Sequence, residues 1–103
     1  MEFFLALPGA HACNNGIPVP KSDCENAGKL LAPNPGRTLQ VGSGGTCLDG
    51  GWGSVPKGCS VQTGGDRAAH FKTHGDTGHG CIDSGYQLVC KVPGIHFLNY
   101  QKN

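Results

Sequence analysis

Six cysteines are the residues in this chain whose number and spacing point most clearly to a chemistry. No two lie closer together than Cys81 and Cys90, whereas zinc sites favour close pairs such as Cys-x-x-Cys. An even number of well-separated cysteines in a short, glycine-rich chain instead favours disulfide bonds. Fifteen pairings are open to six cysteines, and the sequence does not choose among them. We expect all six to form disulfides: Cys13, Cys24, Cys47, Cys59, Cys81 and Cys90.

Three histidines, His70, His74 and His79, form the only cluster of titratable groups along the chain. His70 and His74 are four residues apart, so a helix would place both on one face, as metal ligands on a helix are placed. A hydrolytic zinc site needs a glutamate beside the first histidine, and Phe71 occupies that place. We therefore expect histidines without a metal, and no cofactor. A weak zinc or copper site at His70 and His74, and general-base or pH-sensing work, are the alternatives.

Catalytic residues are harder to single out. A triad can be assembled on paper from Ser60, His70 and Asp66, but the sequence has no nucleophile elbow. The seven acidic residues offer no distinguishable pair for glycoside hydrolysis. The glycine-rich stretch 42–45 is not followed by the Gly-Lys-Ser/Thr of a phosphate-binding loop. We predict that the chain is not an enzyme.

Trp52 stands between glycines, which would leave its ring accessible. One interpretation is a stacking platform for a sugar or for a side chain of a partner. The favoured one is a lid that covers the disulfide cluster. The sequence alone keeps both open.

The composition indicates a domain with a thin core. The 103 residues include 18 glycines and 7 prolines, and glycine has no side chain to bury. Small domains of this kind add disulfides, each of which stabilises by about 2–4 kcal/mol. The net charge of +1 and the dispersed lysines and arginines argue against a nucleic-acid partner. The apolar run 3–7 is too short to cross a bilayer, so we predict no transmembrane span.

The chain divides into three parts. Residues 13–90 form the disulfide-stapled domain. Residues 1–12 are an apolar arm or the remnant of a signal or lumen-targeting peptide, because Ala10-His11-Ala12 fits a small-x-small cleavage site. Residues 91–103 are a strand end and an apolar tail. The flanks either pack on the domain or dock a partner. The candidate partner-binding residues are Phe3, Phe4, Leu5, Leu7, Trp52, Ile95, Phe97, Leu98 and Tyr100.

Helix and strand signals suggest how these residues are positioned. Ser22 and Glu25 form a capping box, which predicts a short helix through Leu31 that ends at 34–36. A second helix is predicted over 66–72, with Asp66 as its cap. Alternating patterns predict strands over 38–41, 59–62 and 86–92. The predicted fold class is a small disulfide-rich α+β domain, with an antiparallel sheet of about three strands and two short helices.

The stretch 52–71 contains Trp52, then Val-Pro-Lys-Gly-Cys, then Gly-Gly-Asp-Arg-Ala-Ala-His, and it is followed by Tyr-Gln-Leu-Val-Cys over 86–90. This pattern resembles cysteine-rich modules of predicted secreted or lumenal proteins of marine algae and other protists. The resemblance covers about 40 residues directly and implies a compartment and a domain class. It implies no biochemical activity.

These observations lead to one favoured function and two alternatives. We expect a secreted, non-enzymatic structural or interaction module that docks on a larger assembly through its apolar flanks. A lumenal accessory subunit of a photosynthetic complex is one form of it, since the thylakoid lumen also tolerates disulfides. The alternatives are an extracellular ligand- or glycan-binding module centred on Trp52, and a small secreted toxin or antimicrobial protein.

Overall fold

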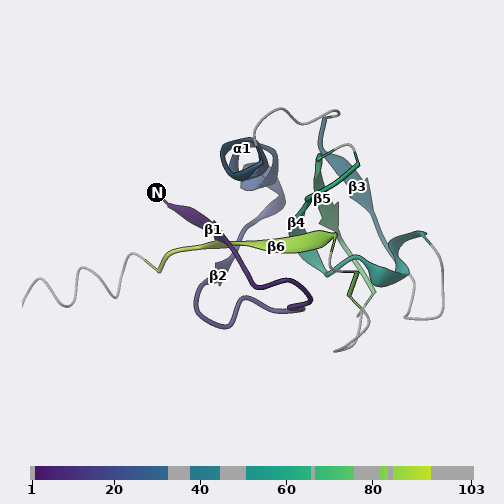
Figure 1. The fold of residues 1–103 in the computed structure, drawn as a ribbon, viewed down its shortest axis with the longest axis horizontal. Coiled ribbons are helices and arrows are strands. Elements are labelled where there is room, and N and C mark those ends of the chain that lie inside the picture. The colour runs from purple at the N-terminus through teal and green to yellow at the C-terminus, as the bar shows by residue number, and fades with distance from the viewer. Residues whose placement is uncertain are drawn as a thin grey trace, which may run out of the picture.

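The structure is a computed structural model, and it describes residues 2–32, 38–44, 51–65, 67–75, 82–83 and 85–93 (Figure 1). One α-helix packs against a mixed sheet in which β6 pairs with three other strands. The elements in chain order are β1 (Phe3–Leu5), β2 (Ile17–Pro18), α1 (Lys21–Leu31), β3 (Gln40–Gly42), the 3-10 helix η1 (Gly51–Ser54), β4 (Gly58–Gln62), β5 (Ala69–Lys72) and β6 (Tyr86–Lys91).

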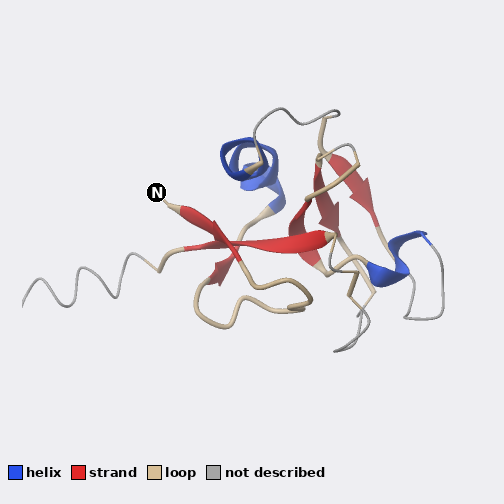
Figure 2. Ribbon diagram, viewed as in Figure 1, coloured by secondary structure: helices blue, strands red, loops and turns tan. Residues whose placement is uncertain are grey.

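Strand β6 joins two parts of the six-stranded sheet (Figure 2). Its first half pairs with β4, with Ser60 opposite Leu88, and the order continues through β5 to β3. Its second half pairs with β1 and with β2, so that Phe4 and Pro18 both lie opposite Cys90. All these pairs are antiparallel except β3 with β5, which is parallel. We call residues 2–18, with β1 and β2, the N-terminal ribbon.

Helix α1 covers one face of the sheet through small side chains. Cys24, Ala27 and Gly28 recur at helical spacing and are buried. At Gly28 the helix lies so close to β5 that an added Cβ would come within 2.7 Å of the Ala69 Cβ. The side chains of Phe3 and Leu5 from β1 pack against the same core. That core consists of Val19, Cys24, Ala27, Cys59, Val61, Ala69 and Val89.

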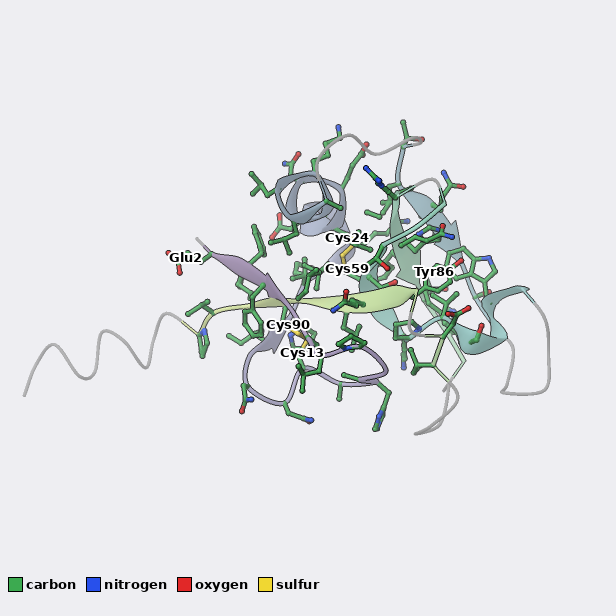
Figure 3. The ribbon with its side chains drawn as sticks, in the orientation of Figure 1. Glu2, Cys13, Cys24, Cys59, Tyr86 and Cys90 are labelled. Atoms are coloured by element: carbon green, nitrogen blue, oxygen red, sulfur yellow. A yellow bond between two sulfur atoms is a disulfide. The ribbon has the colours of Figure 1, made fainter. Side chains whose placement is uncertain are left out.

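Two disulfides confirm that four of the six cysteines are cross-linked. Cys24–Cys59 ties α1 to β4 inside the core, and Cys13–Cys90 ties the N-terminal ribbon to β6 (Figure 3). Cys47 and Cys81 lie outside the described residues. Bonds of this kind persist in oxidising compartments, so the cross-links fit such a location. Within the described ranges, no helix has the length and hydropathy of a membrane span.

The predicted fold class is wrong. The described part of the chain contains one α-helix rather than two, and the sheet has six strands and mixed pairing rather than three antiparallel strands. The predicted strands over 59–62 and 86–92 correspond to β4 and β6, and the strand predicted over 38–41 is displaced to β3.

The second helix, predicted over 66–72, is strand β5. Ala69 and His70 are buried, and His70 and Phe71 pair on both sides, with β4 and with β3, so the sheet satisfies the backbone hydrogen-bonding groups of this segment. Arg67 has a φ of 54°, which a right-handed helix does not allow. The proposed cap, Asp66, lies outside the described residues.

The capping box is also wrong. Helix α1 begins at Lys21 with Pro20 as its N-cap, and no side chain caps it. The Asp23 N–H donates to the Pro20 carbonyl instead, at 3.0 Å. Pro20 has the extended backbone conformation that is typical of an N-cap residue, with φ −69° and ψ 161°. Glu25 lies within the helix and pairs with Lys29 at 3.4 Å. The predicted stop at 34–36 lies outside the described residues.

Candidate functional site

The face of the sheet opposite α1 carries buried polar side chains. Ser60 and His70 lie directly opposite each other on β4 and β5, so their side chains share this face. Lys72, two residues further along β5, shares it too. All three are buried, with Ser60 at 0% and Lys72 at 1% exposure. Buried polar groups of this kind are rare without partners, so their surroundings decide what this face does.

Lys72 holds the segment that covers this face. Its Nζ donates to the carbonyl of Trp52 at 2.8 Å and to that of Val55 at 3.1 Å. The indole of Trp52 lies against Gly42 of β3, where an added Cβ would overlap the ring. Lys72 therefore holds the main chain of Trp52 through a hydrogen bond, and the indole packs against Gly42, where there is no side chain to displace it.

Three rings lie next to one another over this face. The His70 ring is 5.5 Å from that of Trp52 and 5.1 Å, edge to face, from that of Tyr86 (centroid distances). The Nδ1 of His70 lies 2.9 Å from the Ala68 carbonyl, which can only accept a hydrogen bond. Nδ1 therefore carries a proton, and in the neutral ring Nε2 is the acceptor. We call Trp52, His70 and Tyr86 the aromatic row.

The residues proposed for a triad are only partly brought together. Ser60 and His70 lie opposite each other on the adjacent strands β4 and β5. The Ser60 hydroxyl nevertheless has no hydrogen-bond partner among the described residues. A serine nucleophile needs a base within hydrogen-bond distance, and this geometry does not provide it. Asp66 lies outside the described residues.

The histidine pair is not arranged as ligands on a helix. His70 is buried in β5, whereas His74 is exposed after that strand, with its Nδ1 2.9 Å from the Thr73 hydroxyl. His79 lies outside the described residues, and the described ones contain no group of three His, Cys, Asp or Glu able to hold a metal.

A pocket lies in the N-terminal ribbon. It has a volume of about 180 Å³ and lies between β1 and the segment that follows it, with the Cys13–Cys90 disulfide in its wall. The Ala6 N–H donates to the Leu88 carbonyl at 2.9 Å, and the Gln87 side chain donates to the Ala6 carbonyl at 2.8 Å, so the segment is fixed to β6. The lining residues are Phe4, Leu5, Ala6, Leu7, Ala10, Ala12, Cys13, Asn14, Asn15 and Cys90.

The candidate partner-binding residues are divided between the core and the surface. Phe3 and Leu5 pack against the core, and Phe4 is half-buried in the pocket wall. Leu7, which also lines the pocket, is 80% exposed. Trp52 is half-buried. The remaining candidates lie outside the described residues: Ile95, Phe97, Leu98 and Tyr100.

The sequence did not single out Lys72 or Tyr86 as parts of a site. Alternation within 69–72 places His70 and Lys72 on one face, but the helix prediction hid that signal. Comparisons of the chain with protein-family models, with curated proteins and with solved structures give no match.

Proposed function

We propose that the chain is a non-enzymatic interaction module that docks on another protein through its N-terminal ribbon. The observation that carries the proposal is Leu7, a large apolar side chain that is 80% exposed at an apolar pocket. The removal of apolar surface from water is favourable. A partner that inserts an apolar side chain into the pocket and covers Leu7 therefore gains binding free energy.

The ribbon suits docking because it is already ordered. Cys13–Cys90 and the hydrogen bonds of Ala6 hold the pocket wall to β6 before any partner arrives. A preorganised surface loses less conformational entropy on binding than a flexible arm does. Leu30 is 70% exposed on α1 but does not line this pocket, so the pocket rather than exposure alone distinguishes Leu7.

The location belongs to the same proposal. The disulfides fit an oxidising compartment, and we propose secretion, with the thylakoid lumen as the alternative. In the lumen, the module would be an accessory subunit of a photosynthetic complex. The net charge of +1 supports a protein partner rather than nucleic acid.

The test is native mass spectrometry of the full chain isolated from its source. We expect a complex of defined stoichiometry that survives Leu30→Ser and is lost in Leu7→Ser. Both variants replace an exposed leucine, so neither should change the free energy of unfolding by more than the scatter typical of surface substitutions, about 0.5 kcal/mol. A monomeric wild type, or the same complex with Leu7→Ser, would refute docking through the ribbon.

The aromatic row favours a second candidate, a ligand-binding module for sugars. Trp52 and Tyr86 are half-buried on either side of the His70 ring, and aromatic faces stack on apolar sugar faces. Trp52 is the only tryptophan of the chain, so its fluorescence reports directly on this surface. A titration with a panel of oligosaccharides should shift the emission if sugars bind there. An unchanged spectrum up to millimolar sugar removes this candidate.

A further inference from the structure

The two disulfides differ in how an external thiol can reach them. Cys24 and Cys59 are 0% and 2% exposed and belong to the core between α1 and β4. Cys13 and Cys90 both line the open pocket of the N-terminal ribbon. Figure 3 shows the two bonds on opposite sides of β6, with Cys24–Cys59 toward α1 and Cys13–Cys90 toward the ribbon. Exchange requires a thiolate to approach a sulfur atom, so access separates the two bonds.

We propose that the Cys13–Cys90 disulfide is a thiol-exchange site, whose reactant is a compact thiol that enters the pocket. The inference goes beyond docking, because it holds for a small-molecule thiol as well as for a cysteine of a protein. It also predicts an order of reaction, in which Cys24–Cys59 remains oxidised while Cys13–Cys90 exchanges.

The pocket sets the class of reactant. Its volume of about 180 Å³ is comparable to cavities of about 150 Å³ that hold a benzene molecule. The wall is formed mainly by apolar side chains, with the exposed Asn14 and Asn15 as its polar members. A thiol on a short apolar stem fits this space, such as a partner's cysteine flanked by small apolar residues, or a dithiol of similar size.

Burial decides which sulfur is attacked. Cys90 is 0% exposed in β6, whereas Cys13 is half-buried in the ribbon. The incoming thiolate therefore forms a bond to the Cys13 Sγ, the bond between the two protein sulfurs breaks, and Cys90 leaves as a thiolate that takes a proton from water. A single thiol stops at this mixed disulfide. A dithiol displaces Cys13 with its second sulfur, so that it is oxidised and the two protein cysteines are reduced by two electrons.

The opening that follows is local. Reduction frees the ribbon from its covalent tie, which leaves the short ladders of β1 and β2 with β6. The contacts of α1 with β4 keep their own disulfide, Cys24–Cys59. Regions with few stabilising contacts open without unfolding the whole domain, so the segment around Cys13 opens while β1, whose Phe3 and Leu5 pack in the core, stays in place.

The test is timed reduction of the full oxidised chain with dithiothreitol, followed by alkylation and peptide mapping. Trypsin places Cys13, Cys24 and Cys59 in separate peptides, and fragmentation of peptide 73–91 distinguishes Cys90 from Cys81. We expect Cys13 and Cys90 to be alkylated at least roughly tenfold faster than Cys24 and Cys59. Equal rates, or earlier labelling of Cys24 and Cys59, would overturn the proposal.

A pocket variant tests whether the cavity provides the access. Ala10→Phe places a ring in the pocket wall and should slow labelling of Cys13 several-fold, whereas Leu30→Phe on α1 should leave the rate unchanged. Labelling of Cys24 and Cys59 reports on folding in the same sample, because a misfolded variant would expose them as well. With ethanethiol as the probe, we expect the adduct on Cys13; an adduct on Cys90 alone would overturn the assigned point of attack.

Discussion

Gly42→Ala tests whether the packing of the Trp52 indole requires a residue without a side chain at position 42 of β3. A Cβ at position 42 would overlap the indole of Trp52, so the ring or the strand has to move. Overpacking of this kind costs about 1–3 kcal/mol. Gly42 does not have a positive φ, so alanine is otherwise tolerated there and gains about 0.4–1 kcal/mol by restricting the unfolded chain. The expected net result is a loss of about 1–2 kcal/mol in the free energy of unfolding.

The assay is urea unfolding followed by the fluorescence of Trp52, the only tryptophan of the chain. Gly64→Ala is the matched control, because an added Cβ at Gly64 meets nothing within 4 Å. It should leave stability unchanged or raise it by up to about 1 kcal/mol. The native emission spectrum should change in Gly42→Ala and stay unchanged in Gly64→Ala.

A double-mutant cycle isolates the contact itself. In a Trp52→Ala background the overlap is gone, so Gly42→Ala should be neutral or stabilising, which gives a coupling energy of about 1–3 kcal/mol with Trp52. If Gly42→Ala costs the same with and without the indole, or leaves stability and emission at wild-type values, the packing described for Trp52 is refuted.

Three further substitutions test the polar face and the turn beside it by urea unfolding. Lys72→Met removes the two hydrogen bonds that the lysine donates to the Trp52 and Val55 carbonyls of the covering segment and should destabilise by about 2–4 kcal/mol, whereas the exposed Lys57→Met should stay within about 0.5 kcal/mol. Ser60→Ala removes a buried hydroxyl without a partner among the described residues, so it should raise stability by up to about 1 kcal/mol; a loss of that size would show that the hydroxyl is satisfied. Arg67→Gly relieves a φ of 54° and should be neutral or stabilising by up to about 1 kcal/mol, and a clear loss would contradict the strain at this turn.

The features that could be predicted from the sequence depend on neighbours in the chain. The alternation in 86–92 predicts β6, because one pattern of side chains defines both of its faces. The alanine and the two leucines within 27–31 have high helix propensity, which favours the second half of α1. The use of cysteines in disulfides follows from their number and spacing, whereas the pairing of Cys24 with Cys59 depends on the packing of α1 on β4.

The helix predicted over 66–72 failed because distant strands decide the structure there. Two adjacent alanines favour a helix locally, but β5 gains hydrogen bonds from β4 on one side and β3 on the other. The parallel partner, β3, lies about 30 residues earlier in the chain, and no short-range sequence pattern predicts that pairing. The aromatic row was missed for the same reason, since His70 reaches Trp52 and Tyr86 only when β5 is a strand.

The thin core explains why the apolar N-terminus cannot all be available to a partner. A core built around Ala27 and Gly28 needs other side chains to complete it, and Phe3 and Leu5 do so from β1. Substituting either should therefore weaken folding and docking together, because burial of such a side chain contributes about 1.5–3 kcal/mol. Leu7 is exposed and contributes little to that core, so it is a position of the ribbon at which binding can be changed without changing the fold.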